Sequence, residues 1–165
     1  MSGPHTRVYI GVGSNIEPVR HVQIAWRELA KFGQGRRASS VYQCEAQGFD
    51  GPLFYNYVIA LDTHLSLATL KQQLRDIEVR WGRPSQPQKN QSRCLDLDIL
   101  LYGDTVCEQP VTLPRPDVFC YDFVIYPLQE LQSDLIIPGD GRTIGEIAKT
   151  LPANPSLQVV SVALD

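Results

Sequence analysis

An apolar segment interrupted at two alternate positions by aspartate constrains the fold of this chain more than any other feature. The segment runs from Leu95 to Tyr102, and Asp96 and Asp98 are its only charged residues. Residues two apart in a β-strand point to the same face, so a strand here places both carboxylates side by side and turns the leucines the other way. Because aspartate is depleted in strands, the pair indicates a functional site at this strand.

Two carboxylates at this spacing repel each other. Either one proton is retained between them or cations neutralise both, and ligand sets made only of oxygen favour magnesium or calcium over zinc. The alternative is a solvent-facing strand with ordinary acidic residues. Basic residues are also frequent just before the strand. Residues 75–93 contain only two acidic residues, Asp76 and Glu78, but five basic ones, Arg75, Arg80, Arg83, Lys89 and Arg93. We therefore expect an anionic ligand here, as in phosphoryl transfer assisted by two metal ions.

A polar segment from Pro84 to Ser92 separates two of these arginines, Arg83 and Arg93. The segment has no apolar residue that could anchor it to a core, so we expect it to be mobile when no ligand is bound. Guanidinium groups suit phosphate oxygens, and a closing loop would bring both arginines to the transferred group. The alternative is that both are solvated surface arginines.

The rest of the chain alternates between strand-like and helix-like segments. Expected strands run from Thr6 to Val12, Arg37 to Gln43, Tyr55 to Asp62 and Leu157 to Val162, and expected helices from Pro18 to Phe32, Ser66 to Trp81, Tyr121 to Leu131 and Thr143 to Leu151. Cys44 to Leu53 should be a surface loop. The connections are short, and neither a repeat nor a linker occurs. The pattern predicts one domain over residues 1–165, an α+β sandwich of the ferredoxin-like kind with a mainly antiparallel sheet and flanking helices.

Composition narrows the class of protein further. With 43% hydrophobic and 20% charged residues, the 165-residue chain has the balance of a globular domain. A net charge of -3 without a basic stripe argues against a nucleic-acid binder, and no apolar excess suggests a membrane protein. The four cysteines form no CxxC pair, so we expect buried free thiols, and the three histidines should be solvated. The start of the chain lacks signal-peptide features, which favours a cytoplasmic location.

Four motifs, in this order and spacing, resemble a known family. They are Tyr9–Asn15 (YIGVGSN), Phe54–Asn56 (FYN), Arg93–Asp104 (RCLDLDILLYGD) and Phe123–Leu128 (FVIYPL). The stretch around the aspartate pair is the most specific. Together they resemble 6-hydroxymethyl-7,8-dihydropterin pyrophosphokinase over most of the chain, whereas the usual glycine-rich phosphate motifs of other kinases are absent.

The resemblance implies an activity and a set of nucleotide-binding residues. ATP would donate its two terminal phosphates as one unit to the hydroxymethyl oxygen of the pterin, in folate biosynthesis, while AMP leaves. By this likeness Asp96 and Asp98 hold two Mg²⁺ ions, and Arg83 and Arg93 are the catalytic arginines. The ATP contacts implied in addition to these two arginines are Glu78, Ile99, Thr112, Arg115 and Tyr121.

The resemblance also implies a pterin site. Phe54 and Phe123 match an aromatic pair that sandwiches the ring, and Asn56 matches the amide that reads its hydrogen-bonding edge. This agrees with the chemistry, because a flat heterocycle gains from stacking and its edge needs both a donor and an acceptor. Cys44 and Gln47 complete the pocket.

The sequence departs from the family at several positions of the implied site. Asn90 stands where the family has a loop tryptophan, Ser85 where a second loop arginine is frequent, Arg115 where a histidine is usual and Tyr121 where an arginine is expected. Arg115 is placed to supply the charge that Tyr121 lacks. Each uncompensated charged contact to phosphate costs about 1.5–3 kcal/mol, so we expect a slower enzyme or weaker substrate binding.

Two alternative functions stay open. One is a degenerate paralogue that binds ATP or pterin without turnover and has a regulatory or scaffold role. The other is a related transferase that acts on another small alcohol. The segment from Cys44 to Gln47 supports this alternative, because it differs from the segment that the family has at the pterin pocket. In each case the expected partners are small molecules rather than nucleic acid or membrane, and the chain is expected to be a monomer that can contact other folate-pathway enzymes.

Overall fold

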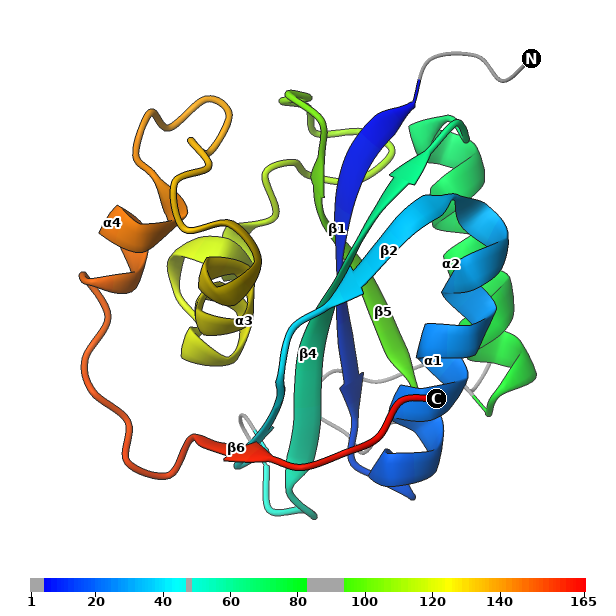
Figure 1. Ribbon diagram of the computed structural model, residues 1–165, viewed down its shortest axis with the longest axis vertical. Coiled ribbons are helices and arrows are strands. Elements are labelled where there is room, and N and C mark those ends of the chain that lie inside the picture. Colours follow the sequence, from blue (N-terminus) through cyan, green and yellow to red (C-terminus); the bar gives the residue numbers. More distant parts are fainter. Residues whose placement is uncertain (1–4, 47–48, 83–93) are drawn as a thin grey trace.

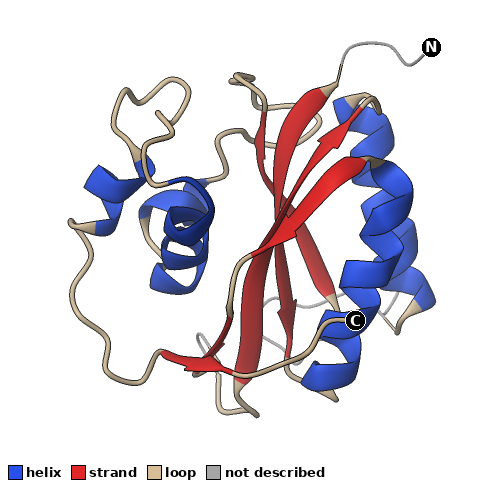
Figure 2. Cartoon of the chain, in the orientation of Figure 1, coloured by secondary structure: helices blue, strands red, loops and turns tan. Residues whose placement is uncertain are grey.

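The structure is a computed structural model that describes residues 5–46, 49–82 and 94–165 (Figure 1). Six strands are assigned, β1 Thr6–Ser14, β2 Gln34–Ala38, β3 Val41–Cys44, β4 Phe54–Thr63, β5 Asp96–Tyr102 and β6 Gln158–Val160. The α-helices are α1 Pro18–Leu29, α2 Leu67–Arg80, α3 Asp122–Gln132 and α4 Ile144–Ala148, and the short 3₁₀ helices are η1 Ala30–Phe32 and η2 Pro116–Phe119. Figure 2 distinguishes the strands from the helices by colour.

All strands belong to one sheet, and every pairing between them is antiparallel. The order is β5-β1-β4-β3-β6, and β2 pairs with β4 beyond the end of β3. The strand that carries the aspartates, β5, therefore lies beside β1. In this register Asp96 is opposite Gly13 and Asp98 is opposite Gly11.

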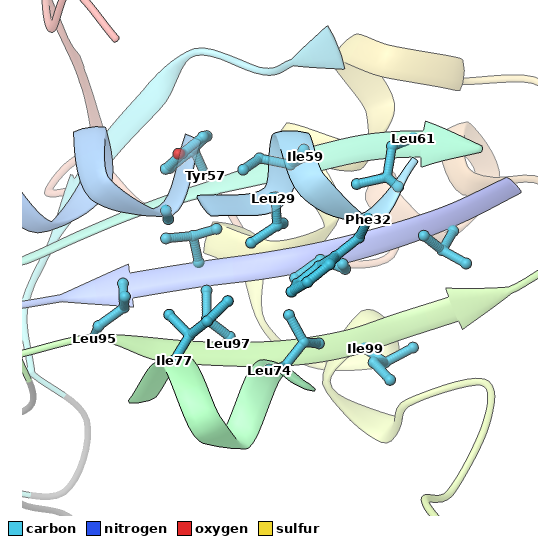
Figure 3. Packing of buried hydrophobic residues seen from close by; sticks show 14 of the residues in the cluster. Leu29, Phe32, Tyr57, Ile59, Leu61, Leu74, Ile77, Leu95, Leu97 and Ile99 are labelled. Carbon is cyan, nitrogen blue, oxygen red and sulfur yellow. The ribbon is translucent and has the colours of Figure 1, made fainter. Parts of the chain in front are cut away.

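Helices cover both faces of the sheet (Figure 1), so the structure has the α+β, ferredoxin-like sandwich expected from the sequence. On one face, α1 and α2 enclose a core that includes Leu74 and Ile77 of α2 and Leu97 of β5, which lie together in Figure 3. On the other face, α3 and α4 pack on a second cluster that includes Tyr9 and Leu100. Successive residues of β1 and β5 thus alternate between two cores, as the period of a strand requires.

Several elements differ in extent from the sequence expectation. The strand expected from Arg37 to Gln43 is divided into β2 and β3, because the hydroxyl of Ser39 accepts a 2.9 Å hydrogen bond from the backbone N–H of Val58 in place of a regular ladder bond. The helix expected to reach Phe32 is α-helical only to Leu29 and continues as η1. The polar loop expected to be mobile, Pro84 to Ser92, lies outside the described residues.

The histidines and cysteines correct two expectations. His21 is buried rather than solvated, since its Nδ1 lies 2.6 Å from the carbonyl oxygen of Ile16 at the start of α1. All four cysteines are free, but of these only Cys44 is buried and Cys120 is exposed. Within the described part of the chain, none of the helices combines the length and the apolar character needed to cross a membrane.

Candidate active site

A pocket opens on the α3 face of the sheet, between the strands and the segment that leads into α3. One wall carries acidic and basic side chains, Asp96 and Asp98 of β5 with Arg115 and Asp117 beyond it. Aromatic and polar side chains, which together form an aromatic wall, also line the pocket, namely Cys44, Phe49, Phe54, Asn56, Tyr121 and Phe123. The floor between them is the backbone of Gly11 and Gly13 in β1. Residues implied separately as metal-binding and pterin-binding therefore share one cavity.

The aspartate pair has the orientation that the strand period predicted. Asp96 and Asp98 line the pocket, whereas Leu97 and Ile99 between and after them are buried in the core under α1 and α2. The residues of β1 opposite both aspartates are glycines, so β1 contributes no side chain directly beside the two carboxylates. Both aspartates are thus half-buried residues of a pocket lining rather than fully exposed residues of an open strand face.

Burial and mutual repulsion act strongly on Asp98. Burial raises the pKa of its carboxyl well above the usual range, the charge of Asp96 raises it further, and the guanidinium of Arg115 opposes both. Arg115 Nη2 lies 3.5 Å from Asp98 Oδ1, and its Nε lies 3.4 Å from Asp117 Oδ2. Burial works against the charge of Arg115, but the two carboxylates outweigh it and leave its pKa raised. Among the described residues, this wall therefore brings three carboxylates, Asp96, Asp98 and Asp117, together with one guanidinium, Arg115.

The donor set of this wall fits magnesium. Within the described residues, no group of three or more His, Cys, Asp or Glu side chains is arranged to hold a metal ion. Two carboxylates on one face are nevertheless the usual protein share of a Mg²⁺ site, because the remaining positions are taken by water and substrate phosphate oxygens. A divalent cation would also relieve the repulsion between Asp96 and Asp98 that helps to raise the pKa of Asp98.

Glu78 positions the aspartate strand from outside the pocket. This side chain, in the last turn of α2, is 5% exposed, and its Oε2 accepts a 2.8 Å hydrogen bond from the backbone N–H of Leu97. That N–H lies between the two aspartates along β5. A buried carboxylate therefore fixes the strand segment that carries the metal-binding candidates, a role that sequence inspection did not assign.

Ile99 and Thr112, which the sequence also implied as ATP contacts, do not place their side chains in this pocket. The side chain of Ile99 packs in the core, so any contact with a nucleotide would have to use its backbone. Thr112 lines a separate surface hollow together with Glu108 and Pro138. The structure thus brings Arg115 to Asp98 and places Tyr121 in the same pocket, whereas the side chains of Ile99 and Thr112 lie elsewhere. Arg83, Arg93 and Gln47 fall outside the described residues.

The aromatic wall holds an amide whose two ends are both constrained. Asn56 Nδ2 donates a 3.0 Å hydrogen bond to Cys44 Sγ. Its Oδ1 lies over Gly13, where a Cβ would come within 2.9 Å of it. Burial raises the pKa of the Cys44 thiol to about 12, so the sulfur stays protonated at neutral pH. Gly13 is a residue that the sequence analysis missed, although glycines at alternate positions of a strand signal a close approach.

Aromatic rings surround this amide. Phe54 is in edge-to-face contact with Phe49, at 6.4 Å between ring centroids. Phe123 is stacked on Tyr121, with centroids 5.0 Å apart and ring planes 19° apart. Tyr121, which occupies the position of an expected arginine, is thus part of the aromatic wall. Phe49 was not anticipated from sequence because it lies in a loop without a periodic pattern.

The fold and the pocket define an α+β protein in which one cavity joins an acidic, metal-compatible wall to an aromatic wall with a fixed amide. Residues 9–133 match the family model described as 7,8-dihydro-6-hydroxymethylpterin-pyrophosphokinase (HPPK). The chain belongs to this family, whose members are ATP-dependent pyrophosphokinases.

Individual relatives agree with this assignment. The chain is 36% identical over 151 residues to 2-amino-4-hydroxy-6-hydroxymethyldihydropteridine pyrophosphokinase of Pseudomonas aeruginosa, covering 88% of this chain and 92% of that protein. It is 34% identical to folic acid synthesis protein fol1 of Schizosaccharomyces pombe over 88% of this chain and 20% of that protein. The crystal structure of a Plasmodium falciparum HPPK-DHPS triple mutant superposes with a TM-score of 0.72 at 10% identity, over 88% of this chain and 44% of that one. This last likeness confirms the fold.

Proposed function

We propose that this chain transfers a pyrophosphoryl group from ATP to the hydroxymethyl group of 6-hydroxymethyl-7,8-dihydropterin and releases AMP. One observation carries the proposal: the carboxylates of Asp96 and Asp98 and the amide of Asn56 line the same pocket, on opposite sides of the glycine floor. A triphosphate held by the acidic wall and a flat heterocycle held by the aromatic wall would meet above that floor.

The acidic wall would hold the phosphates. Asp96 and Asp98 would hold two Mg²⁺ ions, which would neutralise charge on the triphosphate when bound. Arg115 offers a planar guanidinium to phosphate oxygens from the same wall. Arg83 and Arg93, which lie outside the described residues, are proposed as two further cationic residues that bind the phosphates. Glu78 acts indirectly, by holding β5 at Leu97.

The aromatic wall would hold the acceptor. Phe54 and Phe123 provide two ring faces for stacking, and Asn56 offers a donor and an acceptor to the pterin edge. Cys44 supports the amide through the hydrogen bond from Nδ2. The hydroxymethyl oxygen would form a bond to the β-phosphorus as the bond from that phosphorus to the α-phosphate oxygen breaks, and the hydroxyl proton passes to solvent.

The departures from the family favour a reduced rate. Tyr121 is stacked on Phe123 and brings no positive charge to the phosphate side. The same observation supports the second candidate, a protein that binds ATP or pterin in this pocket without turnover. A third candidate, transfer to another small alcohol, rests on the exchange of the usual pocket segment for one that contains Cys44 and Glu45.

The test is the release of AMP from ATP by the purified chain in the presence of Mg²⁺ and the pterin alcohol. We expect AMP formation that requires Mg²⁺ and is lost in Asp96→Ala and Asp98→Ala. Asp104→Asn, at an exposed turn just after β5, is the matched control and should keep full activity. Binding of both substrates by calorimetry without AMP above the Asp96→Ala background identifies the non-turnover candidate, and AMP formation with a competing alcohol identifies the third.

The wider setting is proposed on the relatives. We propose that residues 1–165 act as one catalytic domain, in the cytoplasm, as a monomer that can contact neighbouring folate enzymes. The similarity to one segment of a much longer folic acid synthesis protein supports an association of this kind. Light scattering of the purified chain, alone and mixed with other folate enzymes, tests both the monomer and the association.

A further inference from the structure

Arg115 is held more loosely by its two carboxylate partners than Arg7, Arg80 and Arg142 are held by theirs. Its contacts to Asp98 and Asp117 measure 3.5 and 3.4 Å, beyond the range of about 2.7–3.2 Å for well-formed N–H···O hydrogen bonds. The buried Nε atom has no hydrogen-bond partner among the described residues. Arg142, in contrast, meets Asp140 with two hydrogen bonds of 2.8 and 3.0 Å. Charge rather than hydrogen-bond geometry therefore keeps Arg115 in its position.

The backbone of Arg115 is fixed while its side chain is not. The N–H of Arg115 donates a 3.0 Å hydrogen bond to the carbonyl of Leu100 in β5, and Pro116 begins η2 directly after it. The side chain is 33% exposed and lines the pocket. The guanidinium can therefore change partners within the pocket without any movement of the strand or of η2.

Arg115 and a divalent ion would compete for the same oxygen. Asp98 Oδ1 is the atom that Arg115 contacts, and it belongs to the carboxylate proposed to hold metal. Two cations at one oxygen repel each other, so a bound metal would weaken the Arg115–Asp98 contact. The released guanidinium would keep Asp117 3.4 Å from its Nε, and the Nη2 donor that had faced Asp98 would need a new acceptor. A polyphosphate supplies acceptors for this donor in the planar arrangement that a guanidinium matches.

We propose that Arg115 is a placeholder cation, which neutralises Asp98 in the empty site, yields that carboxylate to a divalent ion and then binds the polyphosphate. The proposal rests on the proposed function, in that it requires the metal site at Asp98. It assigns two successive partners to a residue at which this chain departs from its family. It also explains why a loose ion pair stands here, because a tight bidentate pair would oppose metal binding.

The test compares two ligands on one variant, Arg115→Gln. For Mn²⁺ alone, measured by its paramagnetic signal without nucleotide, we expect affinity to rise about two- to fivefold, as for removal of one partly exposed ion pair. For α,β-methylene-ATP with Mg²⁺, whose scissile linkage cannot be broken, we expect affinity to fall about tenfold or more because a charged contact to phosphate is lost. A purely structural role for Arg115 would not change these two affinities in opposite directions.

Three further variants sharpen the result. Arg115→Lys keeps the charge and should bind Mn²⁺ like the wild type, which provides a readout even if the glutamine variant does not fold. Asp117→Asn removes the second partner, strengthens the pairing with Asp98 and should weaken Mn²⁺ binding. Arg142→Gln, at an exposed pair outside the pocket, should change neither affinity.

The outcomes separate the inference from the proposed function. Unchanged or weaker Mn²⁺ binding in Arg115→Gln overturns the placeholder role, while Mg²⁺-dependent AMP formation would leave the enzyme proposal intact. Failure of both the wild type and Arg115→Gln to bind Mn²⁺ overturns the placeholder role together with the metal site on which it depends.

Discussion

Gly13→Ala, which adds a single methyl group, should weaken pterin binding without destabilising the fold. A Cβ at this position would lie 2.9 Å from Asn56 Oδ1, so the amide oxygen must retreat by about 0.5 Å to reach an ordinary contact of 3.4 Å. Side chains that bind a ligand must be held within about 0.5 Å of their productive position, so a displacement of this size should weaken binding. Retreat of the amide also strains its hydrogen bond to Cys44. Loss of one net hydrogen bond of about 0.5–1.5 kcal/mol corresponds to about two- to tenfold weaker pterin binding.

The structure also predicts what Gly13→Ala leaves unchanged. The clashing atom is the end of a side chain rather than backbone, so the midpoint of thermal unfolding and the affinity for the ATP analogue should stay close to wild type. Gly11→Ala is the matched control, because this glycine also lines the pocket but the atoms nearest to its Cβ would belong to the Leu100 side chain, at 3.4 Å or more. Calorimetric titration with the pterin alcohol measures the effect. Equal pterin affinity in Gly13→Ala and wild type would refute the role given to Asn56.

The remaining predictions concern charge, a buried hydrogen bond and thiol reactivity. Burial and Asp96 raise the pKa of Asp98, so the free energy of unfolding should fall as pH rises from the ordinary carboxyl range through the raised pKa. Asp98→Asn should remove this fall and raise the free energy of unfolding by about 0.5–2 kcal/mol at neutral pH. Urea unfolding across pH measures both proteins, and parallel stability curves for the variant and the wild type would contradict the prediction. Glu78→Ala should lower the free energy of unfolding by about 1–3 kcal/mol, since the N–H of Leu97 loses its acceptor. Glu78→Gln keeps an oxygen there and should lower the free energy of unfolding by less, and equal decreases in the two variants would count against this hydrogen bond. With a pKa of about 12, Cys44 should react with a disulfide reagent at pH 8 only after unfolding, whereas exposed Cys120 reacts at once. Rapid labelling in a variant that keeps Cys44 as its only cysteine, with Cys94, Cys107 and Cys120 changed to Ser, would show an open Cys44 site.

Most of the fold could be predicted from the sequence because it follows from local periodicity. The two-residue period around Asp96 and the helical repeat ending at Trp81 are strong signals. The division at Ser39 could not be foreseen, since its hydroxyl finds the N–H of Val58, nineteen residues away, only after the strands have paired. The burial of His21 is likewise a tertiary effect, as its ring meets Trp81 across α1 and α2.

The site was predicted unevenly for a related reason. Asp96, Asp98, Asn56 and Phe123 were identified because they lie in motifs, and the structure brings them to one pocket. Phe49 was not, because it is in a segment without any pattern. The contacts of Arg115 to two aspartates depend on how η2 folds back against β5, which no spacing along the chain encodes.

The sequence by itself determined the pattern of strands and helices, the common face of the two aspartates and the family to which the chain belongs, because each depends on residues that are near one another in the chain. Tertiary structure alone decided which groups meet across the pocket. It set Gly13 under the amide of Asn56, Glu78 against the backbone of Leu97 and Arg115 beside Asp98. Such contacts follow from strand register and the packing of helices on a sheet, and these are fixed only when the whole chain has folded.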